Sequence, residues 1–71
     1  MPETLITGDD LRRVRKLRGL TRQRMAEALG WGHSNSVYKA EVGLRNLGGS
    51  AVVVIQAMIE ELKAEGLWEE H

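Results

Sequence analysis

The sequence contains no cysteine, no phenylalanine, a single proline, two tryptophans and one tyrosine. Without cysteine the chain forms neither a disulfide nor a thiolate metal site. His33 and His71 are the only histidines, too few and too far apart in the sequence for a zinc site. A chain of 71 residues buries only about 60% of the surface that its unfolded form exposes. We therefore expect one metal-free domain, stabilised by close helix packing or by self-association.

Long apolar runs are absent as well. No stretch approaches the roughly 18 apolar residues of a membrane span, and no signal-peptide pattern stands at the N-terminus. The chain also lacks a glycine-rich phosphate loop and a plausible nucleophile–base pair. We expect a cytoplasmic binding protein that has no enzymatic activity and no cofactor, small-molecule ligand or membrane partner.

An excess of one charge is missing too, because ten basic and ten acidic residues cancel. Their distribution is nevertheless uneven. The basic cluster in the first half of the chain comprises Arg12, Arg13, Arg15, Lys16, Arg18, Arg22 and Arg24. The acidic residues near the end are Glu60, Glu61, Glu65, Glu69 and Glu70. A surface potential follows nearby charge rather than the sum, so the basic cluster predicts an anionic partner. The alternative is that these charges only solvate helix faces, which we expect for two of Arg12, Arg13 and Arg15.

Apolar spacing and capping residues predict a compact all-α chain of four helices, or five. A flexible segment over 1–6 precedes the first helix. Thr7 and Asp10 fit a capping box at the start of that helix, because the hydroxyl and the carboxylate can each satisfy a free backbone N–H group. Thr21 suits the N-cap of the second helix, and Gly30 suits its left-handed end.

The second half of the chain predicts two further helices. The third begins within 32–35 and runs to about Val42. The fourth spans 50–65, with Ser50 as its N-cap, and a tail over 66–71 follows.

The fourth predicted helix is apolar on nearly every side. Branched residues at 51–55 also suit a strand, but the helical pattern continues through Ala64 and favours a helix. One apolar stripe is expected to face the core and consists of Ala51, Ile55, Met58 and Leu62. The remaining sides are apolar too, which in so small a domain predicts burial against a second copy of the chain. The expected homodimer interface consists of Val52, Val53, Ile59 and Trp68.

The segment WGHSN joins the second and third predicted helices through a tight turn that contains glycine. Two short helices joined in this way, here over 21–42, are typical of a helix-turn-helix unit, whose second helix lies in the DNA major groove. Asn can pair with adenine, Ser can bond several bases, and Lys reaches guanine or phosphate. The candidate base contacts, in a recognition helix at about 34–42, are Ser34, Asn35, Ser36, Tyr38 and Lys39.

Phosphate contacts are expected at the start of the second helix, where free N–H groups favour anions, and in the loop after the third helix. The candidates are Arg22, Gln23, Arg24, His33, Arg45 and Asn46. Alternatives stay open, because Asn35 and Ser36 also suit helix capping and Tyr38 also suits packing. Trp31 is expected in the core.

The stretch LTRQRMAEALGWGHSNSVYKAEVG, residues 20–43, resembles the Cro/repressor-type (Xre) helix-turn-helix family. The matching positions are Leu20, Thr21, Met25, Ala26, Leu29, Gly30, Val37, Glu41 and Gly43. The following LRNLGGSAVVVI is similar to the loop and final-helix start of small phage and bacterial regulators, with Arg45 and Gly49 at matching places. The chain departs from the pattern by an additional turn residue within WGHS, by Ala40 in place of an aromatic residue, and by Arg22 in place of glutamine.

The resemblance implies a lambda-repressor-like fold and a sequence-specific repressor of transcription. It implies an autoregulating homodimer that binds an inverted-repeat operator in double-stranded DNA, in the nucleoid of a bacterial or phage-infected cell. Compact regulators of this kind include the autorepressors that accompany anti-CRISPR genes, and antitoxins.

The alternative is a protein-interaction module or antitoxin that keeps the fold with weak or no DNA binding. One feature separates the two hypotheses. Clustering of Arg22, Lys39 and Arg45 on one face with Asn35 favours DNA, whereas scattering or pairing with glutamates favours a protein partner.

Overall fold

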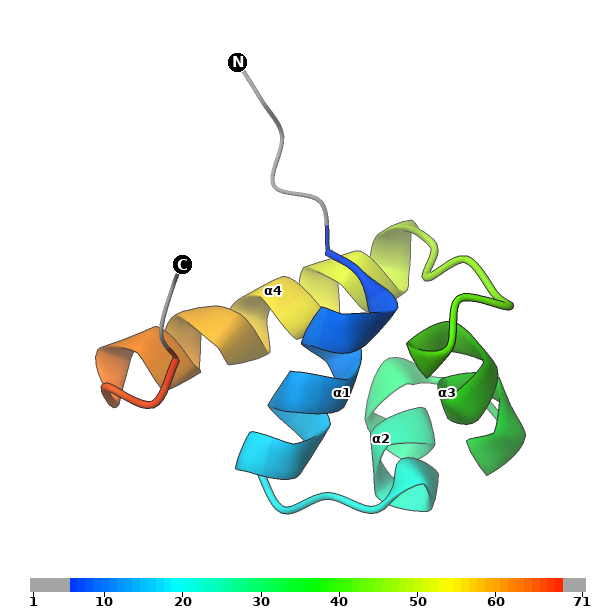
Figure 1. Cartoon of the computed structure of the whole chain (residues 1–71), viewed down its shortest axis with the longest axis horizontal. Coiled ribbons are helices and arrows are strands. Elements are labelled where there is room, and N and C mark those ends of the chain that lie inside the picture. Colours follow the sequence, from blue (N-terminus) through cyan, green and yellow to red (C-terminus); the bar gives the residue numbers. More distant parts are fainter. Residues whose placement is uncertain (1–5, 69–71) are drawn as a thin grey trace.

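A computed structural model describes residues 6–68, and within these residues it contains four helices, no strand and no fifth helix. The helices are α1 (Gly8–Leu17), α2 (Arg22–Leu29), α3 (Ser34–Glu41) and α4 (Gly49–Ala64). The longest helix, α4, crosses behind α1, while α2 and α3 lie together beside α1 (Figure 1). The all-helical prediction is confirmed, and the strand considered at 51–55 does not form.

The first two helices begin at the caps that the sequence predicts. Thr7 and Asp10 form a capping box, in which the Asp10 N–H donates to Thr7 Oγ1 at 3.3 Å and the Thr7 N–H donates to Asp10 Oδ2 at 3.1 Å. Thr21 Oγ1 accepts a hydrogen bond of 3.1 Å from the Arg24 N–H. Gly30 ends α2 with a φ of 75°. Each of these features depends on residues close in sequence, which is why local patterns predict them.

The start of α4 differs from the prediction. Gly48, not Ser50, is the N-cap residue, and no side chain caps the helix. The backbone at Gly48 has a φ of 79°, a conformation that glycine adopts without the steric cost of a Cβ atom. The helix therefore begins immediately after this turn, and Ser50 lies inside its first turn.

The inner side of α4 faces the core, and α4 packs there against α1 and α2. The buried residues of α4 are Ala51, Ile55, Ile59 and Leu62. Met58, which the sequence places on the core stripe, is only partly buried. Ile59 is 5% exposed, so this predicted dimer contact lies in the core of its own chain and has almost no surface left for a partner. Which side of α4 is buried depends on where α1 and α2 pack against it. The apolar periodicity of a single helix carries no information about that packing.

Gly8 brings the start of α1 against the end of α3. A Cβ atom at this position would lie 2.7 Å from the Glu41 carbonyl oxygen and closer still to that of Ala40. Both neighbours are backbone atoms, so neither can rotate away as a side chain would. The absence of a side chain at Gly8 therefore permits the contact between α1 and α3.

Both ends of the described segment pack against the core, at Ile6 and at Trp68. The Arg13 guanidinium lies 4.2 Å from the centroid of the Trp68 ring, so this expected dimer residue is partly covered within its own chain. The first residues of the tail expected over 66–71 also return to α4, because the N–H groups of Gly66 and Leu67 donate to carbonyls of its last turns at 3.0 Å and 2.9 Å. The rest of that tail, 69–71, and residues 1–5 of the segment expected to be flexible lie outside the described residues. Among the described helices, none has the length and apolarity needed to cross a membrane.

Candidate nucleic-acid interface

Hydrogen bonds within the chain hold both ends of the turn between α2 and α3. Gly30 reverses the backbone after α2, and the Trp31 N–H donates to the Ala26 carbonyl at 2.8 Å. His33 then occupies the N-cap of α3 in an extended conformation, and its Nδ1 accepts a hydrogen bond of 3.0 Å from the Asn35 N–H. His33, expected as a phosphate contact, therefore orients the start of α3 by satisfying a free backbone donor.

The outer face of α3 carries three of the five predicted base-contact residues. Asn35, Tyr38 and Lys39 are exposed, and their spacing places them on one side of the helix. Ser34 and Ser36 are half-buried, which leaves them less accessible to a large ligand. The inner face consists of Val37, Ala40 and Glu41, which are all buried.

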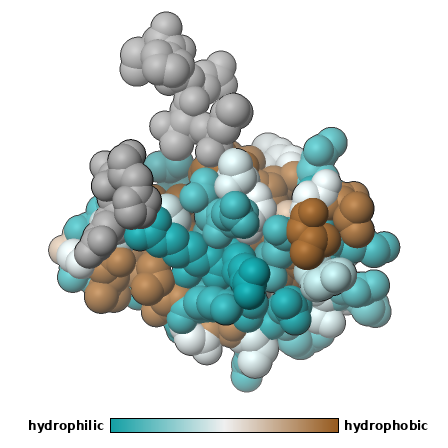
Figure 2. Space-filling model, viewed as in Figure 1, coloured by the Kyte–Doolittle hydropathy of each residue, from teal (hydrophilic) through white to brown (hydrophobic). Residues whose placement is uncertain are grey.

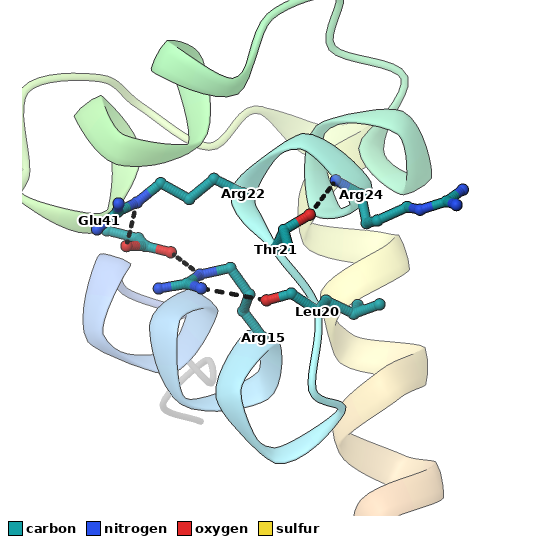
Figure 3. A network of polar contacts seen from close by, with 6 residues as sticks. All are labelled: Arg15, Leu20, Thr21, Arg22, Arg24 and Glu41. Carbon is teal, nitrogen blue, oxygen red and sulfur yellow. Dashed lines mark hydrogen bonds and ion pairs between the residues drawn. The ribbon is translucent and has the colours of Figure 1, made fainter.

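Glu41 is the centre of a polar network that joins three helices (Figure 3). Its side chain is 3% exposed and lies 2.6 Å from Arg15 Nε and 3.4 Å from Arg22 Nε. Arg15 Nη1 also donates to the Leu20 carbonyl at 3.1 Å. Arg15, from α1, thus holds the end of α3 and the segment before α2. Its side chain is only 12% exposed, so Arg15 is not one of the two solvating residues expected among Arg12, Arg13 and Arg15.

The predicted phosphate contacts at the start of α2 all have acidic partners. Arg22 pairs with Glu41, although its side chain remains 44% exposed and its guanidinium lies 5.3 Å from the centroid of the Tyr38 ring. Arg24 lies 3.5 Å from Glu27 Oε1, and Gln23 donates to Glu27 Oε2 at 3.4 Å. Of the three cations that separate the two hypotheses, Arg22 thus pairs with a glutamate, which on its own favours a protein partner over DNA.

Lys39 and Arg45, the other two cations near α3, differ from Arg22 in their partners. Among the residues that the structure describes, neither Lys39 nor Arg45 forms an ion pair with a carboxylate. Lys39 lies on the outer face of α3, and Arg45 lies in the loop that follows, with its guanidinium 4.3 Å from the centroid of the Trp31 ring. Trp31 is half-buried and packs against the core. Asn46 is exposed in the same loop.

Exposed apolar side chains occur in the loop after α3 and on α4. Leu44, in the loop after α3, is 75% exposed, and Val53, on α4, is 69% exposed, whereas Val52 is half-buried. In the view of Figure 2, brown patches appear beside the α3–α4 connection and near the C-terminal end of α4, separated by a broad hydrophilic surface. The surface of residues 6–68 has no pocket, and these residues contain no cluster of metal-ligating side chains.

The sequence did not predict the roles that three residues have in the fold, and the reason differs for each. Glu41 follows the buried Val37 and Ala40 at helical spacing, and this position was a usable signal that its carboxylate points inward. His33 is not among the usual N-cap residues, so composition gives no indication of its role. The close approach at Gly8 depends on a residue 32 positions away, for which the sequence carries no local signal.

Searches against protein-family models, curated proteins and solved structures find no match for this chain.

Proposed function

We propose that the chain binds double-stranded DNA, with α2 and α3 as a helix-turn-helix unit and α3 as its recognition helix. The observation that carries this proposal is the exposed polar face of α3, on a short helix that follows α2 after only residues 30–33. A turn of this length with a glycine is typical of helix-turn-helix units. The major groove of DNA is wide enough to admit such a helix.

The base-reading role falls to the outer face of α3. Asn35 lies in the first turn of the helix, the part that contacts base edges in this geometry. Its amide can donate to and accept from adenine in a bidentate pair. Lys39 lies one turn further along and can reach guanine or a phosphate. Tyr38 lies beside them and offers an apolar ring and a hydroxyl group.

The phosphate contacts are redistributed relative to the sequence expectation. Lys39 and Arg45 carry charges that no carboxylate of the described residues neutralises, and Asn46 adds an exposed amide. Arg22 has a structural role in the Glu41 network and retains an exposed part that can approach a phosphate. Such contacts set affinity and orientation, whereas Asn35 sets sequence preference.

The proposal extends to a homodimeric repressor, on the strength of the family resemblance. Two subunits joined through α4, chiefly at Val52 and Val53, would place two α3 helices in successive major grooves about 34 Å apart. A dimer bound over a promoter would exclude polymerase and so repress transcription in the nucleoid. An inverted-repeat operator follows from the two-fold symmetry of the dimer.

Two lysine substitutions test whether α3 is the DNA-binding surface. Lys39→Ala removes an exposed charge from α3, and Lys16→Ala removes a matched exposed charge from α1; neither lysine has an ion pair among residues 6–68. Fluorescence anisotropy with a labelled duplex, at several salt concentrations, measures affinity and salt slope. We expect Lys39→Ala to reduce the slope by about one unit and Lys16→Ala to leave it unchanged. Equal effects of the two substitutions would contradict the proposal.

Substitution of Asn35 tests the base-reading role separately. Asn35→Ala should cost about 1–3 kcal/mol on a preferred duplex and relax the preference at one base pair, with an unchanged salt slope. A parallel loss on all duplexes would assign Asn35 to phosphate contact instead.

The second candidate function is a protein-interaction module. It is favoured by the acidic partners of Arg22 and Arg24 and by the exposed Leu44. An absence of duplex binding at low salt by the wild-type protein would favour this candidate.

A further inference from the structure

The side chains of Trp31 and Arg45 are in contact and join two segments that flank α3 in the sequence. Trp31 is in the turn before the helix, and Arg45 is in the loop after it. The guanidinium carbon of Arg45 lies 4.3 Å from the centroid of the indole ring, within the range of a cation–π interaction. Trp31 is half-buried and packs against the core, so the ring that Arg45 contacts is held in place.

The loop that carries Arg45 is otherwise exposed. Its residues 43–46 are all exposed, and a hydrogen bond of 2.8 Å from the Leu44 N–H to the Lys39 carbonyl ties its beginning to α3. An arginine in such a loop would normally sample many rotamers, and their loss on binding would reduce affinity. Contact with Trp31 restricts Arg45 before any ligand arrives.

Contact with an aromatic ring also leaves the N–H donors of the Arg45 guanidinium available. A guanidinium group uses its face to contact an aromatic ring, while its N–H groups point outward in the plane and match the oxygens of a phosphate. Arg22, by contrast, directs Nε to the buried carboxylate of Glu41. Of these two arginines near α3, Arg45 therefore combines a restricted side chain with a charge that no described carboxylate neutralises.

We propose that Trp31 is a positioning residue that holds Arg45 in place to bind a phosphate of the DNA backbone. This inference rests on the proposed DNA-binding function and adds the way in which one contact is organised. Trp31 itself touches no nucleic acid in this account. It acts through Arg45, and its contribution to binding disappears when Arg45 is absent.

A double-mutant cycle tests this dependence. Trp31→Leu keeps an apolar side chain against the core and removes the aromatic face, while Arg45→Ala removes the cation. A third variant carries both substitutions. The affinity of each variant is measured by anisotropy titration with a preferred duplex and with a scrambled duplex. Arg45→Ala should weaken binding about tenfold on both duplexes, because phosphate contacts carry no sequence information. Trp31→Leu should weaken it about threefold in the wild-type background and should have no further effect in the Arg45→Ala background.

Rescue and controls separate positioning from folding. Trp31→Phe restores an aromatic face and should recover most of the affinity that Trp31→Leu loses. Circular dichroism and thermal unfolding of each variant report whether the fold is retained. If Trp31→Leu weakens binding equally with and without Arg45, Trp31 has a merely structural role and the inference is overturned. The same holds if Trp31→Leu has no effect in either background. If the wild-type protein binds neither duplex at low salt, the proposed function fails and this inference fails with it.

Discussion

At the scale of single residues, Glu41 determines how three helices meet. Its carboxylate is almost fully buried and is neutralised by Arg15 from α1 and Arg22 from α2. A buried charge that loses its partner is strongly destabilising, because the remaining charge has been removed from water without compensation. The same carboxylate keeps Arg22 close to α3 and so shapes the surface proposed to meet DNA.

Glu41→Gln should therefore lower the free energy of unfolding by about 3–5 kcal/mol, because Arg15 would stay buried without a counter-charge. The matched control is Glu61→Gln, since Glu61 pairs with Arg18 at 3.1 Å on the surface, where its side chain is 68% exposed. That change should cost no more than about 1 kcal/mol. Urea unfolding followed by circular dichroism measures both values. Equal losses would show that burial of Glu41 does not matter.

A second residue-scale prediction concerns Gly8. Gly8→Ala should destabilise the fold by about 1–3 kcal/mol, because the added methyl group collides with backbone oxygens of Ala40 and Glu41. Gly49→Ala is the matched control, since Gly49 is also the first residue of a helix and has open space around its Cβ position. There alanine should be neutral, or stabilise by up to about 1 kcal/mol. Thermal unfolding of both variants decides whether α1 and α3 approach as closely as described.

At the scale of elements, α3 depends on a histidine cap. His33→Ala removes the only side-chain bond to the start of this helix that the described residues provide, and should cost about 1 kcal/mol. His33→Asn supplies another acceptor and should recover most of that loss. Unfolding measurements on the two variants provide the comparison.

DNA titration of His33→Asn then separates capping from phosphate binding. An unchanged salt slope agrees with a capping role. A slope reduced by about one unit would restore His33 to the phosphate contacts that the sequence predicts.

Local elements are also where sequence reasoning succeeds. The Thr7–Asp10 capping box, the Thr21 cap and the left-handed Gly30 all follow from residues within one helical turn. The buried face of α4 does not, because apolar residues cover nearly the whole helix and only its partners decide which side turns inward. Ile59 lies in the core for that reason, while Val53 remains outside.

At the scale of the whole molecule, opposite charges that lie far apart in the sequence meet within the fold. Arg18 lies 3.1 Å from Glu61 and 3.2 Å from Glu65, so the end of α1 pairs with the end of α4. Together with the Arg15–Glu41 pair, these contacts neutralise part of the basic cluster. Part of the positive charge from which an anionic partner is predicted is thus neutralised by carboxylates of the same chain. Pairing across 26 or more positions is invisible to composition, which explains why sequence reasoning overestimated the free positive charge.

The proposed dimer belongs to this scale as well. Val53→Asp should raise the dimer dissociation constant at least about tenfold, because an unpaired carboxylate would be buried between subunits. The fold of the monomer should be unaffected, since the valine side chain is largely exposed. Leu44→Asp is the control, a matched change at an exposed apolar residue outside α4. Sedimentation equilibrium measures both constants. If Val53→Asp leaves the dimer dissociation constant unchanged, the interface lies elsewhere. If the wild-type protein is a monomer at every concentration, the proposal of a homodimer is wrong.

The central claim is that this chain recognises DNA by sequence. The most direct measurement selects a preferred duplex from a randomised pool and then titrates the wild-type protein against that duplex and a scrambled one, at two salt concentrations. We expect a preference of about a thousandfold or more for the selected duplex, and an affinity for both duplexes that falls as the salt concentration rises. Equal affinity for the two duplexes, or no binding at low salt, would contradict it.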